Sequence, residues 1–290
     1  MQQLVTSELI HWIAEQRQAG YSESTILHSM MTTGWSQSTA LAALAQKTVI
    51  SSNTIKSHQS IDSFRHFSAE LPEPKVSEGA TSLWAGDREV NVLFAMKRPR
   101  LVVFGSFMTN EECDALCQAA SPYLVRSKTV KLDEADPKMN EAVHEARTSD
   151  GMFFHRGQND LCQRIESRIA TLLNWPVDHG EGLQVLHYKP GAEYKPHYDY
   201  FEPGHPASAS FLQRGGQRVG TLLMYLNTPV RGGSTSFPDV DLEVSALKGN
   251  AVFFSYEQPD PSTRTLHGGS PVIEGEKWIA TKWLRQDHFG

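Results

Sequence analysis

The first 46 residues carry apolar side chains at the spacing of amphipathic helices, in three successive groups. Serines stand where N-caps are expected and glycines follow the first two groups, which is the usual punctuation of short helices. The apolar groups are Leu9, Ile10 and Ile13, then Ile26, Leu27, Met30 and Met31, then Leu41, Ala43 and Leu44; the caps are Ser7, Ser22 and Ser36, and the stops are Gly20 and Gly34. Residues 1–46 are therefore predicted to form a small three-helix module, of the kind that packs as an appendage or docks to a protein partner.

The composition changes from residue 47 to residue 83, where serines are frequent, Pro72 and Pro74 occur and large apolar residues are few. Such a segment buries too little apolar surface to offset the entropy that is lost on ordering. We predict a linker over 47–83, followed by a folded domain over 84–290.

This domain is predicted to begin with a strand and two helices. An apolar run indicates a strand over 100–104, and Thr109 with Glu112 has the pattern of a capping box that opens a helix ending near Ala120. A second helix is predicted over 160–173, because apolar residues recur there on one face. These residues are Leu161, Ile165, Ile169 and Leu172.

Short runs of β-branched and aromatic residues, separated by glycine and proline, follow after residue 180. The runs cover 183–188, 219–226, 234–237, 251–256 and 278–284. Helices followed by many short strands argue against alternating βαβ units. We predict an α+β fold that is mainly β, with a double-stranded β-helix (jelly-roll) core braced by helices. The segment 202–216, rich in glycine and proline, is predicted to be a mobile loop over the mouth of this core.

Charge and hydropathy narrow the classes of partner. Thirty-three acidic and 27 basic residues give a formal net charge of −6, which disfavours nucleic acid. No apolar run approaches the ~20 residues of a transmembrane helix, and the N-terminus lacks the pattern of a signal peptide. We therefore expect no membrane partner and a cytoplasmic location. The three cysteines, few and odd in number, fit a reducing compartment.

The segment Gly191–Tyr200 combines residue types that bind metals. His197 and Asp199 are two residues apart, so on an extended strand both side chains leave the same face. His267, in a glycine-flanked stretch after the predicted strand 251–256, is the best candidate for a third ligand. Two imidazoles and one carboxylate leave three adjacent octahedral positions open, an arrangement that suits non-haem Fe(II) holding a cosubstrate and O2.

Lys277 strengthens this interpretation, because it stands ten residues beyond His267 at the start of an apolar strand pattern. A lysine that enters a β-barrel from inside is a costly buried charge unless an anion meets it, and a dicarboxylate cosubstrate would supply that anion. The alternative is a lysine at the strand edge whose ammonium group reaches water.

The chain from about Arg98 onward resembles the prolyl 4-hydroxylase family of Fe(II)- and 2-oxoglutarate-dependent dioxygenases. The resemblance covers roughly two-thirds of the chain and rests on many motifs in order rather than on a single one. The matching segments include RPRLVVF (98–104), EEC (111–113), RTS (147–149), LQVLHY (183–188), HYD (197–199), TLLMYLN (221–227), GGSTSFP (232–238), HGGSPV (267–272) and KW (277–278).

The resemblance implies a site and a reaction. It implies Fe(II) bound by His197, Asp199 and His267, and Lys277 paired with the distal carboxylate of 2-oxoglutarate. The implied reaction hydroxylates proline in a peptide or protein, consumes O2 and releases succinate and CO2, with ascorbate as the reductant. Hydroxyl partners of the same carboxylate would be Tyr188 and Thr235, and residues similar to those lining the peptide groove are Arg147, Ser149, Glu181, Tyr194, Arg218 and Trp283.

Other interpretations of these residues stay open at this point. Arg147 and Arg218 could form surface ion pairs, and Tyr194 and Trp283 could serve packing alone. Arg285 stands where algal and plant members are expected to have a histidine, which affects the substrate geometry. An oxygenase of the same fold acting on a free amino acid or another small molecule is the main alternative function. A non-catalytic metal-binding or docking protein is a further one.

Overall fold

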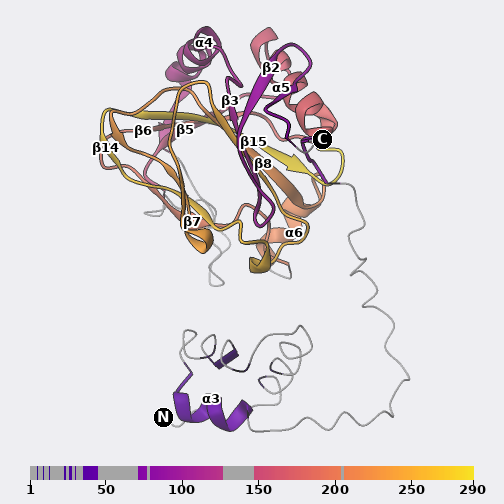
Figure 1. Ribbon diagram of the computed structural model, residues 1–290, viewed down its shortest axis with the longest axis vertical. Coiled ribbons are helices and arrows are strands. Elements are labelled where there is room, and N and C mark those ends of the chain that lie inside the picture. Colours follow the sequence, from indigo (N-terminus) through magenta and orange to yellow (C-terminus); the bar gives the residue numbers. More distant parts are fainter. Residues whose placement is uncertain are drawn as a thin grey trace. The chain divides into compact units, whose positions relative to one another are not determined.

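The computed structural model describes residues 5, 9, 13, 23, 26, 27, 30, 35–44, 71–76, 79–126, 147–203 and 206–290. The chain divides into two compact units, Met1–Phe64 and Arg65–Gly290, and Figure 1 draws both. Within the described ranges, no helix combines the length and the apolar character that a membrane span requires.

The small unit contains the helix α3 (Gln37–Leu44). Ser36 caps this helix, because its Oγ accepts a hydrogen bond of 3.2 Å from the amide of Thr39. Leu41 is 48% exposed, so its predicted place on the apolar face is wrong; residues 40, 43 and 44 form that face instead. The buried cluster joins Leu9, Ile13, Ile26, Met30, Ala40, Ala43 and Leu44. The predicted caps and stops at Ser7, Gly20, Ser22 and Gly34, with Ile10 and Met31, lie outside the described residues.

Two antiparallel β-sheets pack against each other in the large unit, as a jelly roll (Figure 1). The larger sheet has the strand order β1-β2-β3-β12-β8-β15-β6-β5-β4, the smaller has β11-β10-β13-β7, and β14 pairs with β9. The strands are β1 (Ser82–Trp84), β2 (Glu89–Met96), β3 (Arg100–Gly105), β4 (Val125–Arg126), β5 (Asp150–Phe153), β6 (Gln184–Tyr188), β7 (Tyr194–His197), β8 (Arg218–Tyr225), β9 (Arg231–Gly232), β10 (Thr235–Phe237), β11 (Leu242–Val244), β12 (Ala251–Ser255), β13 (His267–Gly269), β14 (Val272–Glu274) and β15 (Lys277–Arg285). The five predicted runs after residue 180 all correspond to strands, and the predicted fold class is confirmed.

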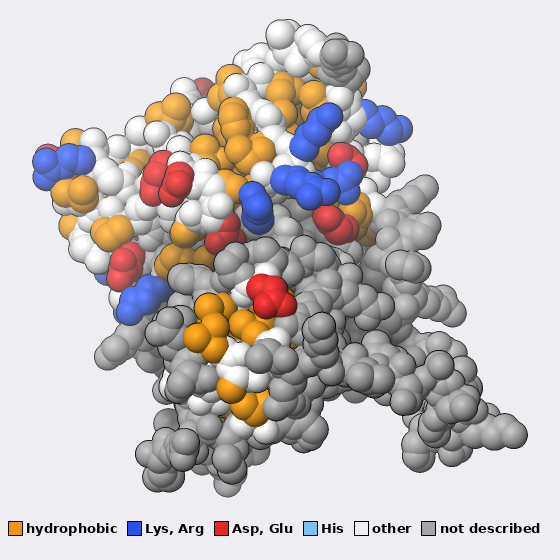
Figure 2. Space-filling model, turned by 60° about the horizontal axis from the view of Figure 1, so that its bottom comes forward, with side chains coloured by type: hydrophobic (Ala, Val, Ile, Leu, Met, Phe, Trp, Pro, Cys, Tyr) orange, Lys and Arg blue, Asp and Glu red, His pale blue; other side chains and the backbone are white. Residues whose placement is uncertain are grey.

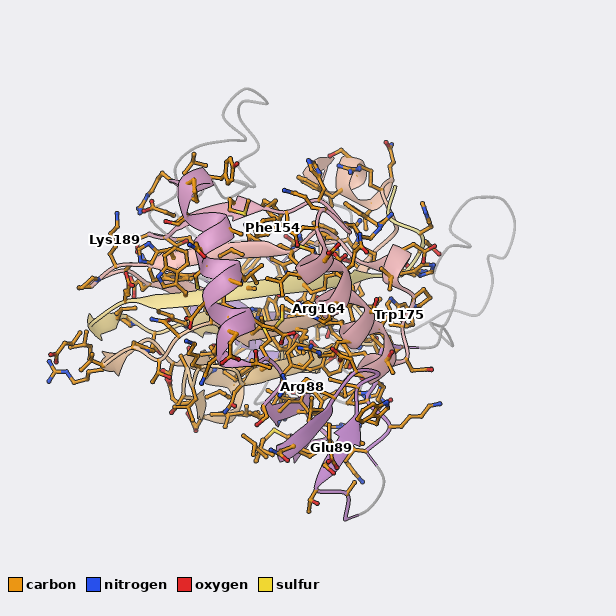
Figure 3. All side chains as sticks on the ribbon, turned by 90° about the horizontal axis from the view of Figure 1, so that it is seen from above. Arg88, Glu89, Phe154, Arg164, Trp175 and Lys189 are labelled. Carbon is orange, nitrogen blue, oxygen red and sulfur yellow. The ribbon has the colours of Figure 1, made fainter. Side chains whose placement is uncertain are left out.

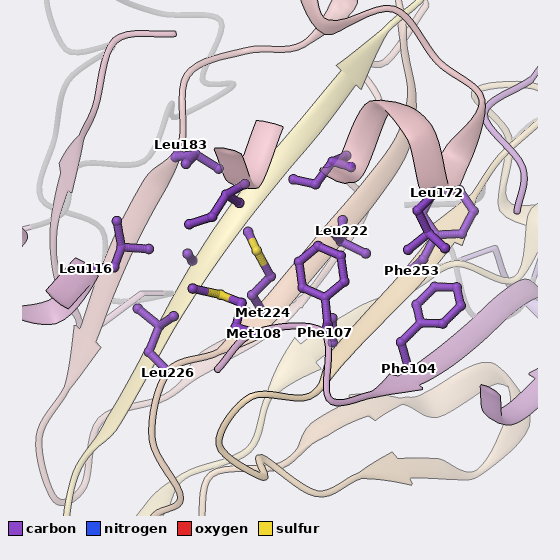
Figure 4. Close-up of a cluster of buried hydrophobic side chains, with 14 of the residues drawn as sticks. Phe104, Phe107, Met108, Leu116, Leu172, Leu183, Leu222, Met224, Leu226 and Phe253 are labelled. Atoms are coloured by element: carbon purple, nitrogen blue, oxygen red, sulfur yellow. The ribbon is translucent and has the colours of Figure 1, made fainter. Parts of the chain in front are cut away.

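Alternate residues of the central strands face two different apolar cores, as the pleat of a strand requires. On β8, Leu222 and Met224 join the cluster beneath the helices, which Figure 4 shows. Leu223 and Tyr225 join the cluster between the two sheets. Because both faces of these strands are buried, the sequence shows continuous apolar runs rather than an alternating pattern.

The helices α4 (Asn110–Ala120) and α5 (Asp160–Leu173) lie across the outer face of the larger sheet, as seen from above in Figure 3. The predicted capping box is present, because the side chain of Thr109 accepts from the amide of Glu112, and the Glu112 carboxylate accepts from the amide of Thr109. Asn159 caps α5, and both predicted helices are confirmed. The other helical segments in the described part of the large unit are α6 (Pro206–Leu212) and the 3₁₀ turns Ser121–Tyr123, Val177–His179, Pro238–Val240 and Pro261–Thr263.

A buried ion pair joins α5 to the larger sheet. Lys282 of β15 and Glu166 of α5 lie 2.6 Å apart, and their side chains are 2% and 1% exposed. The second carboxylate oxygen of Glu166 accepts from the amide of Gly157 at 2.8 Å. The pair is therefore well satisfied, which is the condition under which a buried charge is tolerated.

Two segments differ from the boundaries expected from the sequence. The sheet begins at Ser82 rather than after residue 83, and the amide of Glu73 donates to the carbonyl of Leu173 at 2.9 Å. Val76 also packs against the core beneath the helices, so residues 71–76 contact the large unit. Residues 47–70, 77 and 78 of the expected linker lie outside the described residues. The predicted loop 202–216 contains α6, because its glycines and prolines mark only the ends of a short helical stretch.

Candidate active site

His197, Asp199 and His267 converge where β7 pairs with β13. His197 and His267 are register partners across the two strands. Nε2 of each imidazole lies 3.5 Å from a carboxylate oxygen of Asp199, and the three potential ligand atoms all lie within 4.8 Å of one another. The structure thus brings together the three residues that the sequence selects as metal ligands.

Backbone hydrogen bonds fix both imidazole rings. Nδ1 of His197 lies 3.0 Å from the carbonyl oxygen of Lys195, and Nδ1 of His267 lies 2.9 Å from that of Thr265. Nδ1 must carry the proton in order to donate to a carbonyl, so the lone pair of each ring is on Nε2, the atom that faces Asp199. This is the tautomer that binds a metal ion at Nε2.

The protonation states also suit metal binding. Burial disfavours the charged form of Asp199, but the nearby His267, His197 and Arg218 outweigh burial and hold the pKa of the carboxyl well below its usual range. Burial lowers the pKa of His267 to about 4. Neutral imidazole and ionised carboxylate are the ligand forms that metal binding requires. Thr221 adds a hydrogen bond of 2.7 Å from its hydroxyl to Oδ2 of Asp199, which orients the carboxylate.

This donor set fits one ferrous ion. Two nitrogens and one carboxylate oxygen on a single face are the ligands typical of non-haem Fe(II) centres, with further positions open for a cosubstrate and O2. The ligands would be Nε2 of His197, Nε2 of His267 and the Asp199 carboxylate.

Lys277 lines a cavity that the same three residues line. Its side chain is buried, with only 2% of the residue exposed, which rules out the alternative of an ammonium group reaching water. Nζ donates to the carbonyl oxygen of Ser234 at 3.2 Å, and no described carboxylate lies within ion-pair distance. Burial lowers the pKa of Lys277 to about 7, although Glu243 acts in the opposite direction. The cavity therefore offers an anion a buried ammonium group.

Residues with hydroxyl groups line the same cavity as this ammonium, or lie close to it. Thr235 is buried, lines the cavity and accepts a hydrogen bond of 2.9 Å from Tyr225, so its own proton is free to point elsewhere. Nζ of Lys277 lies 5.6 Å from the ring centre of Tyr188 and 6.0 Å from that of Tyr225. Burial raises the pKa of both tyrosines, which stay neutral donors. Tyr188, Thr235 and Lys277 thus line one cavity, and the roles that the resemblance implies for the two hydroxyl groups stay a prediction.

The cavity adjoins a groove of about 1230 Å³ that is lined by several predicted substrate residues. Arg147 forms a β-bridge with Tyr194 and stands over its ring at 5.2 Å, and Tyr194 stacks on His197 at 3.7 Å between ring centres. Ser149 differs from its prediction, because it is fully buried, lines neither cavity nor groove, and hydrogen-bonds Tyr188 instead. Its neighbour Arg147 and the facing Tyr194 do line the groove.

Glu181, Arg218 and Trp283 meet in the wall of this groove. Arg218 makes two hydrogen bonds to the Glu181 carboxylate, at 2.7 and 3.0 Å, and one of 3.3 Å to the backbone carbonyl of Asp199. Its guanidinium carbon lies 3.9 Å from the ring centre of Trp283. Arg285 donates to the same Glu181 carboxylate at 2.9 Å. Arg218 therefore does form an ion pair, as considered from the sequence. Its partner is Glu181, the pair lies in the groove wall, and Arg218 also bonds to the backbone of the candidate iron ligand Asp199.

Sequence reasoning missed three residues of the site, namely Thr221, Tyr225 and Gln184. Each lies in a predicted strand, and a polar residue at a position that faces the inside of a barrel is the signal that could have found them. Gln184 Oε1 and Trp283 Nε1 are buried and have no hydrogen-bond partner among the described residues. Both side chains line the cavity and the groove, so one acceptor and one donor are available there to a ligand.

A jelly roll that carries two histidines, one aspartate and a buried lysine defines the class of 2-oxoglutarate-dependent non-haem iron oxygenases. Residues 183–285 match the family model described as the 2OG-Fe(II) oxygenase superfamily. A probable prolyl 4-hydroxylase 3 of Arabidopsis thaliana is 38% identical over 225 residues, covering 70% of this chain and 75% of the relative. Prolyl 4-hydroxylase 1 of the same plant is 40% identical over 233 residues, covering 71% and 78%. The chain belongs to the prolyl 4-hydroxylase family.

Solved structures are also similar. The viral collagen prolyl hydroxylase of Paramecium bursaria Chlorella virus-1, in its 2OG complex, is 30% identical, covers 64% of this chain and 95% of its own, and has a TM-score of 0.49. As a 2OG-Fe(II) oxygenase, the protein uses Fe(II), 2-oxoglutarate and O2.

Proposed function

We propose that this protein hydroxylates proline residues within a peptide or protein chain, with conversion of 2-oxoglutarate to succinate and CO2. The observation that carries the proposal is the groove of about 1230 Å³ that opens onto the metal residues and the cavity of Lys277. A groove of this size exceeds the usual 300–1,000 Å³ of small-molecule sites and is larger than a free amino acid needs. The prolyl 4-hydroxylases among its relatives support proline as the target.

The residues of this chain divide the task. Lys277 supplies the charge for the distal carboxylate of 2-oxoglutarate, and the hydroxyl groups of Tyr188 and Thr235 supply further donors. The bound iron supplies the oxidising chemistry. We propose that Trp283 Nε1 and Gln184 Oε1 hold the substrate backbone, and the lack of a hydrogen-bond partner for either atom among the described residues supports this role.

The test is mass spectrometry of proline-containing peptides incubated with the protein, Fe(II), 2-oxoglutarate and O2. A gain of one oxygen on proline, with stoichiometric succinate, is expected. The variant His267→Ala, which loses a candidate ligand, should produce neither. Turnover of a free amino acid or another small molecule, with no product from any peptide, would instead support the small-molecule alternative.

Three further proposals concern the surroundings of the reaction. We propose that ascorbate restores enzyme activity after unproductive cycles and that a protein partner binds the small unit. A reducing, cytoplasmic environment is supported by Cys113, Cys117 and Cys162, which are all free thiols. Nucleic acid remains disfavoured, and on the face drawn in Figure 2 basic side chains lie among acidic ones instead of forming a patch of one sign.

A further inference from the structure

The chain between the candidate iron ligand Asp199 and the strand β8 supplies part of the groove lining. We call its described residues, 201–203 and 206–217, the groove segment. Several of them line the groove, namely Phe201, Glu202, Pro203, Ser208, Phe211 and Arg214. The contacts that hold this segment therefore determine the shape of the groove beside the metal residues.

Arg285, the last residue of β15, holds this segment with all three nitrogens of its guanidinium group. Nε and Nη2 donate to the carbonyl oxygen of Gly216 at 3.2 and 2.6 Å, and Nη2 also donates to that of Phe211 at 2.5 Å. Nη1 donates to the carboxylate of Glu181 at 2.9 Å. Because the side chain is buried, these hydrogen bonds are shielded from water. One residue thus joins two backbone carbonyls of the groove segment to a carboxylate that lines the groove from another part of the chain.

The turn that presents the Gly216 carbonyl is built from two glycines. Gly215 and Gly216 have φ angles of +85° and +68°, which glycine adopts without strain. A Cβ atom at Gly215 would lie 3.3 Å from Cβ of Arg285, and one at Gly216 would lie 2.7 Å from the carboxylate of Asp287. The turn therefore packs closely against the end of β15 and leaves no room for a side chain.

Phe201 fixes the start of the groove segment. Its amide donates to Oε1 of Gln217 at 2.7 Å, and its carbonyl accepts from Nε2 of the same side chain at 2.8 Å. Its ring stacks on that of Phe211 at 5.3 Å between ring centres. The guanidinium carbons of Arg218 and Arg285 lie 4.8 and 5.0 Å from the centre of the Phe201 ring, within the range of cation–π interactions. Arg285 consequently contacts both the start and the end of the groove segment.

The same contacts extend to the metal residues. Arg285 and Arg218 share the carboxylate of Glu181, and Arg218 donates to the backbone carbonyl of Asp199 at 3.3 Å. Burial disfavours the charged form of Glu181, but Arg218 and Arg285 outweigh burial and hold the pKa of its carboxyl below the usual range. The groove segment, Glu181 and the backbone of a candidate iron ligand therefore belong to one hydrogen-bonded network.

Resting on the proposed function, we propose that Arg285 is a positioning residue for the peptide substrate. It fixes the groove segment relative to Glu181, Arg218 and Asp199, and thereby holds the bound peptide with its target proline at the metal residues. A displacement of about 1 Å can cost on the order of 10²-fold in rate, so a groove wall without a fixed position would let 2-oxoglutarate be consumed without hydroxylation of the peptide. Lysine cannot take this role, because its single nitrogen does not reproduce the planar fork of donors.

The first test is the coupling ratio, defined as succinate formed per oxygen gained on proline. Both products are measured by mass spectrometry in one sample, with the peptide that the test of the proposed function shows to be hydroxylated. Arg285→Lys and Arg285→Met should raise the ratio on the order of fivefold above the wild-type value and raise the KM of the peptide on the order of tenfold. A merely structural defect leaves fewer active molecules, which lowers both products together and keeps the ratio unchanged.

Arg168→Lys is the matched control. Arg168 is as buried as Arg285, with 2% exposed, and likewise donates to carboxylates and to backbone; its acceptors are Asp87, Glu112 and the carbonyl of Phe107. It lines neither the groove nor the cavity of Lys277. This variant should lose stability but keep the wild-type coupling ratio and the wild-type KM of the peptide.

The second test needs no turnover and follows amide hydrogen exchange in the protein holding Fe(II) and 2-oxoglutarate without O2. Arg285→Met should accelerate exchange in residues 206–217 on the order of tenfold and leave α5 unchanged, whereas Arg168→Lys, on α5, should do the reverse. Gly216→Ala disturbs the contact from the other side, because its φ angle and the nearby Asp287 oppose a side chain, and should act like Arg285→Met in both tests. Arg285→Lys and Gly216→Ala carry both tests if Arg285→Met does not fold.

The outcomes separate this proposal from the proposed function. A wild-type coupling ratio in the Arg285 variants, or unchanged exchange in residues 206–217, overturns the positioning role. Equal rises of the ratio in the Arg285 variants and in Arg168→Lys also overturn it, since they would show a general loss of structure. If the wild-type protein adds oxygen to no proline-containing peptide, the proposed function fails, and the exchange measurement alone then decides about Arg285.

Discussion

The hydroxyl of Thr221 donates to the carboxylate of Asp199 and also lies 3.2 Å from the hydroxyl of Tyr256. A residue of this kind orients a metal ligand without touching the ion. Such partners commonly contribute 10- to 100-fold to metal affinity, because a freely rotating carboxylate binds less well.

Replacement of this hydroxyl should therefore weaken iron binding. Thr221→Val keeps the shape of the side chain and is expected to lower Fe(II) affinity by about 10- to 100-fold in anaerobic titrations. The matched control is Thr281→Val, a buried threonine that lines the cavity of Lys277 but makes no contact with Asp199 that the structure shows. Equal losses in both variants would indicate a general disturbance of the cavity instead.

The pKa of Lys277 predicts how cosubstrate binding depends on pH. Burial lowers this pKa to about 7, and 2-oxoglutarate requires the protonated ammonium, so its Kd should rise about tenfold per pH unit above pH 7. Lys277→Arg keeps a positive charge over this range and should show a weaker pH dependence. Isothermal titration of the Fe(II)-loaded, oxygen-free protein between pH 6 and pH 9 measures both; identical pH profiles would contradict the assignment of Lys277.

The same shift affects stability with a definite sign. The unfolded chain binds a proton at Lys277 up to about the ordinary pKa of 10.5, whereas the folded chain without cosubstrate loses it near 7. The unfolded state thus binds more protons between these values, so the contribution of Lys277 makes the free energy of unfolding rise with pH across that window.

At the scale of single residues, sequence analysis located the side chains that carry distinctive chemistry and missed those that support them. His197, Asp199, His267 and Lys277 stood out because their types are rare in apolar strands. Thr221 did not, because threonine is an ordinary strand residue and its hydroxyl gains a role only when β8 lies beside the Asp199 loop. The interaction of Arg285 with α6 joins segments that are distant in sequence, and no local pattern encodes it.

At the scale of elements, the ion pair between α5 and β15 ties a covering helix to the sheet that carries the site. Its strength depends on both partners being present, because removing one leaves an uncompensated buried charge. Burial lowers the pKa of Lys282, and the Glu166 carboxylate opposes that shift.

Glu166→Gln should accordingly destabilise the large unit by about 3 kcal/mol, whereas the double variant Glu166→Leu with Lys282→Met should recover most of that loss. Denaturant unfolding followed by tryptophan fluorescence measures both. If the double variant were as unstable as the single one, the hydrogen bond from the amide of Gly157 to Glu166 would be the dominant contribution instead.

The elements that the sequence predicts well are those with two buried faces or clear caps. α5 has the predicted bounds, and five strands of the larger sheet coincide with the apolar runs, namely β3, β6, β8, β12 and β15. Nine of the described strands were not predicted, because they are short, contain glycine or proline, or expose one side; these are β1, β2, β4, β5, β7, β9, β11, β13 and β14. The helix α6 was not predicted either, because it is short and glycine and proline residues stand at both of its ends.

At the scale of the whole molecule, the described segment 71–76 and the strand β1 belong to the large unit. Glu73 bonds to the end of α5 and pairs with Arg100 at 2.9 Å, and β1 extends the sheet by pairing with β2. The change in composition at residue 84 did not reveal this, because proline-rich extended segments that pack on a surface have the composition of linkers.

Two truncations test this boundary. Deletion of residues 1–70 should leave the Tm of the large unit and its conversion of 2-oxoglutarate to succinate nearly unchanged. Deletion of residues 1–83 removes β1 and the contacts of segment 71–76, and should lower the Tm by about 5 °C or more. Calorimetry of both proteins measures the two Tm values. Equal values would indicate that the stable domain begins at residue 84, as the sequence composition suggests.

Four residues on one face of the strand β15 line the cavity or the groove, namely Lys277, Thr281, Trp283 and Arg285. Six residues of extended chain separate the anion anchor from the tryptophan, a fixed spacing of ~20 Å. An insertion or deletion of one residue between Lys277 and Trp283 would turn one of these two side chains away from the site. The length of β15 therefore sets the positions of the proposed cosubstrate anchor and of the proposed substrate contact together. Changes of specificity in this protein are therefore expected from exchanges of side chains along β15 rather than from changes in the length of this strand.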